Sequence, residues 1–252
     1  MKRFLALRVF VLGTWLGTML AGCGAHTLPE IHSETERLAT ARRLHAEGDN
    51  SDAIELLKVY STGASGAADV DEAIYLLGQC YLGIKDWTLA ANEFERLLRD
   101  YPESDSSASA SFRLGEAYYG QSRKEDFDQE YTSKALDQWQ SYIRAYPGHW
   151  LNAEANHRIL QARTRLANKL LATGRLYLKL RVYEPARFYF RRVIQDYADT
   201  SARPRAELGL AMADARQKKR DAAVAALRDI EARYPGQPVA QEAQRERRRI
   251  EH

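Results

Sequence analysis

The side chains in this 252-residue sequence with reactive or metal-binding chemistry are two cysteines and six histidines. The histidines are scattered, and no pair of them stands at ligand spacing with an acidic residue. Asp126, Asp128 and Glu130 are close together but lack the glycine and the closing glutamate of a calcium-binding loop. The sequence has no glycine-rich phosphate loop and no nucleophile elbow. We therefore expect no enzyme activity, no cofactor and no metal site.

Cys23 is the cysteine whose surroundings predict a reaction. It follows a basic start, an apolar run from Phe4 to Leu20, and two small residues, which is the pattern of a secretory signal. The Leu-Ala-Gly-Cys step resembles the lipobox of bacterial lipoproteins, in which the cysteine is acylated and becomes the first residue. Several acyl chains anchor a protein firmly, whereas one chain binds only marginally. Arg8 interrupts the run, which is too short for a plain membrane-spanning helix.

The charge of the predicted mature chain is balanced. Lys2, Arg3 and Arg8 are the only charged residues before Cys23, and removing them from the 37 basic residues leaves 34, equal to the 34 acidic residues. A neutral chain is no general nucleic-acid binder. Cys80, the other thiol, lies in an apolar helical pattern, which favours a small buried side chain.

A second strong signal is a repeated pattern. An alanine is followed four residues later by a large apolar residue and twelve residues later by a proline. The alanine and apolar pairs are Ala90 and Phe94, Ala135 and Trp139, Ala186 and Phe190, and Ala223 and Leu227; the third has lost its proline. Gly78, Gly115 and Gly174 precede the first three pairs. This pattern resembles the tetratricopeptide repeat (TPR), a 34-residue pair of antiparallel helices.

Packing explains why these residue types recur. Glycine and alanine allow two helices to approach closely, and we expect the large apolar residues to fill the space against the next repeat. A single helix pair cannot bury its apolar faces, so several repeats must stack. The terminal prolines stop each second helix.

The predicted fold is therefore all-α, a TPR solenoid of about five repeats. We divide the chain into a signal (1–22), a lipidated tether (23–32), an N-terminal half with repeats one to three (33–148) and a C-terminal half with repeats four and five and a last helix (149–252). Eight extra residues within 121–132 predict a longer loop in repeat three, and residues 150–180 predict a long helix. Asp214 replaces the usual tyrosine of repeat five.

Within the TPR class, the order of the repeats and several short stretches of sequence resemble the BamD (YfiO) family of outer-membrane lipoproteins. The most specific stretch comprises Arg165-Leu166-Ala167, Tyr177, Tyr183 and 196–200, with Ala198 in place of a proline. The resemblance implies a lipid-anchored protein on the periplasmic face of the outer membrane that binds unfolded outer-membrane proteins. It also implies partners: the POTRA domains of the barrel subunit BamA, and other lipoproteins of the assembly machine.

The family docks on BamA through its fourth repeat. The corresponding interface residues here are Tyr183, Arg187, Tyr189 and Arg191. A family arginine falls on Tyr189, so its salt bridge is kept only if Arg187 or Arg191 takes it over. Leu170 also replaces a glutamate of the family pattern.

The inward positions of the first helices predict a substrate groove. Its candidate residues are Leu38, Arg42, Tyr75, Phe112 and Tyr119. Apolar rings with a few donors suit an extended apolar peptide that ends in a carboxylate, which Arg42 would bind. The alternative is that the aromatic residues only pack against neighbouring helices.

Two other functions remain open at this stage. One is a TPR scaffold lipoprotein of another envelope system, such as a pilus pilotin or a cell-wall synthesis adaptor, because a fold does not fix a function. The other is a lipid or glycan carrier, or an enzyme, with a buried pocket. Dense small-residue packing and the absence of acid pairs disfavour it.

The anchor gives a direct prediction. Cys23→Ser removes the acylated atom, so the variant accumulates as an unlipidated precursor that keeps its signal. Gly24 replaces the aspartate that retains enterobacterial lipoproteins in the inner membrane, so the wild type fractionates with the outer membrane. Mass spectrometry and membrane fractionation measure both outcomes, and a Cys23→Ser protein that is processed and fractionates normally would contradict the prediction.

Overall fold

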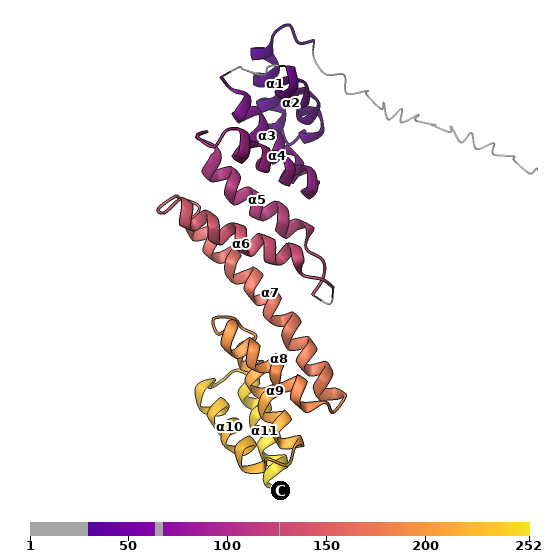
Figure 1. The fold of residues 1–252 in the computed structure, drawn as a ribbon, viewed down its shortest axis with the longest axis vertical. Helices are drawn as coiled ribbons and strands as arrows, with labels where there is room; N and C mark the ends of the chain where they lie inside the picture. Colours follow the sequence, from indigo (N-terminus) through magenta and orange to yellow (C-terminus); the bar gives the residue numbers. More distant parts are fainter. Residues whose placement is uncertain (1–29, 64–67, 126) are drawn as a thin grey trace, which may run out of the picture. The chain divides into compact units, whose positions relative to one another are not determined.

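The computed structural model describes residues 30–63, 68–125 and 127–252, and these residues form helices without any strand (Figure 1). Cys23, the predicted signal and residues 23–29 of the predicted tether lie outside the described residues. Residues Ile31–His252 make one compact unit. Among the described helices, none combines the length and apolar character that crossing a membrane requires.

The helices follow one another as hairpins, which confirms the predicted all-α repeat fold. The five hairpins are α1 (Glu34–Glu47) with α2 (Asn50–Gly63), α3 (Val70–Gly83) with α4 (Trp87–Asp100), α5 (Ser107–Gln121) with α6 (Glu130–Ala145), α7 (Asn152–Lys179) with α8 (Tyr183–Asp196), and α9 (Arg203–Arg216) with α10 (Arg220–Arg233). The last helix is α11 (Pro238–Glu251). Each helix packs on its neighbours in the chain, and α9 also contacts α7 and α11.

Two departures from a regular repeat lie where the sequence predicted them. The loop between α5 and α6 holds the extra polar residues, and the side chain of Gln129 donates to the carbonyls of Lys124 and Phe127 at 2.9 and 3.1 Å. Helix α7 has 28 residues, and its first half packs on α6 while its second half pairs with α8. Helix α7 therefore takes part in the packing of both the third and the fourth repeat.

The hairpin turns of repeats one, two, four and five share one backbone conformation. Lys85, Arg181 and Lys218 have φ angles of 62°, 61° and 61°, and Gly48 has 90° at the corresponding turn of repeat one. A left-handed residue other than glycine costs roughly 1–2 kcal/mol, so the packing of the paired helices must impose it.

In repeats two, three and four, a glycine of the first helix faces an aromatic ring of the second helix. A Cβ atom on Gly78 would lie 2.6 Å from Cε1 of Phe94, and one on Gly174 would lie 2.7 Å from Cε1 of Phe190. Gly115 faces the indole of Trp139 in the same way, and that indole donates to the Phe112 carbonyl at 3.1 Å. Real Cβ atoms do not approach so closely, so the glycines are required.

This arrangement adds to one expectation. The sequence predicted that Phe94 and Trp139 fill space against the next repeat, and they share core clusters with residues of that repeat. Each also covers the glycine of its own repeat. Phe190 does both, because Gly209 of the following hairpin lies on its other side, 2.5 Å from Cζ to the position of a Cβ atom.

Gly78→Ala tests this contact. Helix propensity alone predicts a gain of up to about 1 kcal/mol, whereas overpacking against Phe94 predicts a loss of about 1–3 kcal/mol. We expect the midpoint temperature of unfolding to fall. It is measured on the full chain in detergent by circular dichroism. Gly63→Ala is the control, because no atom lies within 4 Å of the added methyl group. Equal effects of the two substitutions would refute the glycine–aromatic contact.

Candidate functional site

The predicted groove residues do not all face outward. Leu38 and Phe112 are 2% and 1% exposed, and both belong to hydrophobic core clusters. Phe112 packs edge-on against Tyr142, with ring centroids 5.7 Å apart. These two residues therefore cannot line an open groove in this structure, because the neighbouring helices already cover their side chains.

Arg42 already has an acidic partner. Its Nε and Nη2 atoms donate to the two carboxylate oxygens of Glu72 at 2.7 and 2.6 Å, which joins α1 to α3. Because Glu72 occupies these two N–H donors, the Arg42 guanidinium cannot use them to bind a peptide carboxylate through paired hydrogen bonds. The sequence offered no signal for this pair, because its members lie in different repeats.

Tyr75 and Tyr119 are half-buried, and each has an aromatic neighbour. The ring of Tyr75 lies 6.0 Å from that of Phe94, and its hydroxyl accepts from Gln79 at 3.1 Å. The ring of Tyr119 lies 5.7 Å from Trp139, beneath the guanidinium of Arg165 at 5.4 Å.

Tyr119 lines a cavity of about 440 Å³, which we name the inner cavity. The other residues that line it are Leu82, Gly83, Trp87, Arg113, Glu116, Gly120, Trp139 and Arg158. Leu82 comes from α3, and Glu116 and Tyr119 come from α5, so the cavity joins the first helices of repeats two and three. Tyr75 is not among the lining residues.

A charged network crosses this cavity. Glu116 accepts from Arg113 at 2.5 Å and from Arg158 at 3.2 Å, and Arg158 also pairs with Glu154 at 2.8 Å. Sequence reasoning missed both arginines, since Arg158 comes from the first half of α7, outside the repeat pattern. The inner cavity thus offers aromatic and apolar walls with two guanidinium groups, a combination that suits an extended peptide.

The predicted partner residues on α8 divide into two groups. Arg187 is only 12% exposed and pairs with Asp214 of α9, while Gln217 accepts a second bond from it at 3.4 Å. It is therefore a contact between repeats four and five, and it is not free for a partner. The same pair explains why Asp214 stands where repeats usually have tyrosine.

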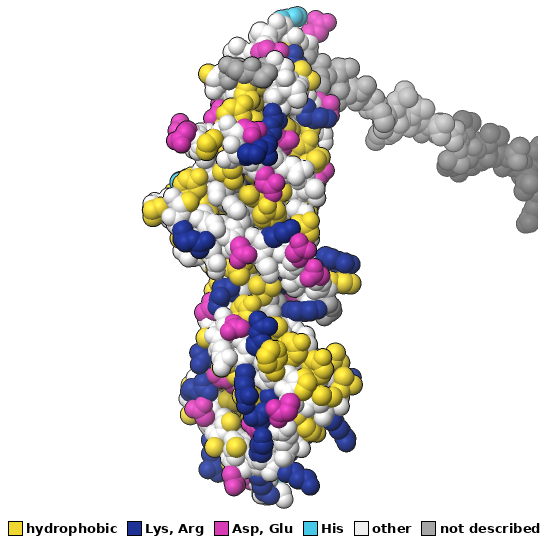
Figure 2. Space-filling view, in the orientation of Figure 1, with side chains coloured by type: hydrophobic (Ala, Val, Ile, Leu, Met, Phe, Trp, Pro, Cys, Tyr) yellow, Lys and Arg dark blue, Asp and Glu magenta, His cyan; other side chains and the backbone are white. Residues whose placement is uncertain are grey.

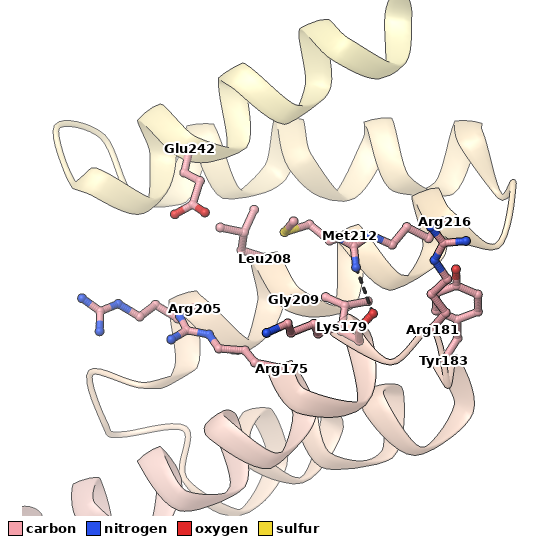
Figure 3. Close-up of a pocket in the computed structure, with 11 residues that line it drawn as sticks. Arg175, Lys179, Arg181, Tyr183, Arg205, Leu208, Gly209, Met212, Arg216 and Glu242 are labelled. Atoms are coloured by element: carbon pink, nitrogen blue, oxygen red, sulfur yellow. Dashed lines mark hydrogen bonds between the residues drawn. The ribbon is translucent and has the colours of Figure 1, made fainter.

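The other predicted partner residues lie nearer the surface. Tyr189 stacks on Tyr177 with ring centroids 5.6 Å apart and 10° between planes, and Arg191 is exposed. Tyr183 lines a groove between α7, α9 and α11 (Figure 3).

An exposed apolar patch lies beside Tyr189, at the end of α7 and the start of α8. Its members are Leu176, Leu180, Val182 and Phe188. Figure 2 shows hydrophobic side chains gathered on this corner of the molecule. Four large apolar residues exposed together are unusual on a monomer and mark an interaction surface.

The described residues hold no group of three or more metal-ligating side chains. Burial raises the pKa of the Cys80 thiol to about 12, so this cysteine stays protonated at neutral pH.

Helix hairpins stacked on glycine–aromatic contacts define a tetratricopeptide-repeat scaffold, and a tetratricopeptide repeat model matches residues 205–236. The model of the YfiO family, described as outer membrane lipoprotein, matches residues 32–213, well over half of the chain. The chain belongs to this YfiO (BamD) family. The family's characteristic 196–200 stretch has a structural role, since Asp199 binds Arg163 of α7 at 2.6 Å.

Comparison with curated proteins gave no match. Solved structures that resemble the chain include a TPR repeats protein from Bacteroides fragilis, with 13% identity, a TM-score of 0.48, and coverage of 87% of this chain and 100% of that one. The TPR2AB-domain:pHSP90 complex of yeast Sti1 has 12% identity, a TM-score of 0.44, and coverage of 82% and 80%. These likenesses concern the fold alone.

The Arg187–Asp214 pair gives a prediction that separates an internal role from a partner role. Asp214→Asn leaves a largely buried guanidinium without its counter-ion, so we expect a loss of about 1–3 kcal/mol in the free energy of unfolding. Asp221→Asn, at an exposed position of α10, is the control. Replacing both partners, as Arg187→Met with Asp214→Leu, recovers much of the loss. A silent Asp214→Asn in thermal unfolding would contradict the internal pairing.

Proposed function

We propose that this chain is a periplasm-facing lipoprotein of the outer-membrane β-barrel assembly machinery. In this proposal it is anchored through acylated Cys23, binds unfolded barrel substrates and docks on the POTRA domains of a BamA-like subunit, next to other lipoproteins of the machine. The observation that carries the proposal is the match to the YfiO family across 32–213. Its role is protein binding, and we propose no catalysis.

The apolar patch supports docking on a barrel subunit. Leu176, Leu180 and Phe188 are 55%, 60% and 55% exposed, beside the stacked Tyr177 and Tyr189. Large apolar and aromatic side chains ringed by exposed charges, such as Arg191, are typical of the energetic centre of an interface. Arg191 is the exposed cation that can take over the contact of the family arginine, since Arg187 is engaged by Asp214.

The inner cavity supports substrate binding in the N-terminal repeats. An extended strand presents alternate side chains on one face. Trp87 and Tyr119 offer aromatic surface to such side chains, and Arg113 and Arg158 offer donors for backbone carbonyls or a terminal carboxylate. Arg113 binds Glu116 through Nη1, and Arg158 binds Glu116 through Nη2 and Glu154 through Nε, so each guanidinium has further N–H groups beyond these pairs.

Phe188→Ser tests the docking surface. Truncating an aromatic residue at the centre of an interface commonly costs ~2 kcal/mol or more, so we expect capture of the BamA-like subunit from detergent-solubilised envelopes to fall by more than about tenfold. Phe127→Ser is the matched control, because Phe127 is a similarly exposed phenylalanine in the repeat-three loop. Unchanged capture by Phe188→Ser would remove the patch from the interface. Recovery of a pilus or cell-wall protein instead would favour a scaffold of another envelope system.

Photo-crosslinking tests the inner cavity. A photo-reactive residue at Tyr119 should crosslink to a peptide that copies the last strand of an outer-membrane barrel, and removing the final aromatic residue of that peptide should weaken the crosslink. The same residue at Trp150, an exposed position outside both the inner cavity and the groove that Tyr183 lines, is the control. Crosslinks from Trp150 but not from Tyr119 would end the assignment of substrate binding to the N-terminal repeats.

A further inference from the structure

A second groove lies between the end of α7, the length of α9 and the start of α11, with a volume of about 810 Å³ (Figure 3). We name it the basic groove, because five cations line it and Glu242 is the only acidic residue among its lining side chains. The cations are Arg175, Lys179, Arg181, Arg205 and Arg216.

These cations differ from most arginines of the same repeats in having no carboxylate partner among the described residues. Arg163, Arg233 and Arg247 each pair with a carboxylate at 3.0 Å or less. In the part of the chain that the structure describes, no carboxylate lies within 4.0 Å of any of the five cations of the basic groove. Arg216 donates one bond, at 2.9 Å, to the Leu178 carbonyl. The groove therefore holds concentrated positive charge that the fold itself does not neutralise.

The charges lie around an apolar floor. Leu208, Gly209 and Met212 of α9 line this part of the groove (Figure 3). Arg175 and Arg205 are drawn toward one end, and Arg181 toward the other. Lys179 lies between them, and Glu242 lies toward the end of Arg205 (Figure 3). A ligand that fills the groove thus meets positive charge along its length and apolar side chains of α9 along one wall.

The length of the groove follows from helix geometry. Arg205 and Arg216 are eleven residues apart on α9, which corresponds to about 16 Å along the helix axis. An extended peptide covers that distance in about five residues. In such a peptide the first, third and fifth side chains share one face, so two acidic residues with an apolar residue midway between them match the groove.

We propose that the basic groove binds a short acidic segment of another polypeptide in extended form. Arginine binds carboxylates through paired hydrogen bonds, and a cleft lined by one sign of charge concentrates ligands of the opposite sign. A lipid headgroup presents its charge at one point, which fits a groove with cations along its whole length less well. The proposal goes beyond the proposed docking and does not rest on it, because the apolar patch uses other residues.

The test is fluorescence anisotropy with the full chain in a non-ionic detergent. The probe is a labelled peptide, Glu-Ala-Leu-Ala-Glu, with both ends blocked, and the comparison peptide has glutamine at both acidic positions. We expect the acidic peptide to bind at least about tenfold tighter, and to weaken as salt rises. Arg175→Glu with Arg205→Glu should reduce its affinity by at least about tenfold.

Arg245→Glu with Arg248→Glu is the matched control, because both arginines are exposed on α11 outside the groove and the change in net charge is the same. It should change affinity by no more than about twofold. Circular dichroism checks that both variants fold, and neutralising pairs (Arg175→Gln with Lys179→Gln against Arg245→Gln with Arg248→Gln) replace them if either does not.

Three results would overturn the proposal. The first is equal binding of the acidic and glutamine peptides, including no binding of either. The second is an equal loss in the control variant, which would mean general charge attraction. The third is binding to phosphatidylglycerol vesicles, but not to the peptide, that depends on Arg175 and Arg205, which would assign the groove to a lipid headgroup. None of these results bears on Phe188 or on capture of a barrel subunit.

Discussion

Contact between a glycine on the first helix of a repeat and an aromatic ring on the second sets the spacing on which the rest of the structure depends. The ring occupies the volume where a Cβ atom would be, so the backbone of one helix lies directly against a side chain of the other. Phe190 extends the same contact to the next repeat, because it lies between Gly174 and Gly209. Small residues thus fix how closely the helices stack, and large ones fill the remaining space.

Ion pairs between helices add a second layer of contacts at the edges of this packing. Arg42 with Glu72 and Arg233 with Glu207 join different helices, and Arg163 of α7 binds Asp199 in the turn after α8. Exposed pairs contribute little stability, but the largely buried Arg187–Asp214 pair is costly to break from one side. These pairs consume many of the arginines, which makes the unpaired cations of the basic groove stand out.

Helix α7 presents two different surfaces at its end. Leu176 and Leu180 are four residues apart and lie on one face, in the apolar patch. Arg175 and Lys179 are also four residues apart but are rotated by one residue, and they line the basic groove. A helix turns by about 100° per residue, so neighbouring positions serve different partners. One helix end can therefore contribute to a hydrophobic interface and to an anion-binding groove at once.

The sequence by itself determined the all-α repeat fold, the long helix within residues 150–180, the long loop of repeat three and the need for Gly78, Gly115 and Gly174. These features depend on local periodicity and on residue size, and both can be read directly from the sequence. Only the tertiary structure decided that Leu38 and Phe112 are core residues, that Arg187 binds Asp214, and that Arg175 and Arg205 share a groove. Burial and charge pairing depend on which residues the stacking of successive repeats brings together, and residues in different repeats leave no periodic signal of their contact.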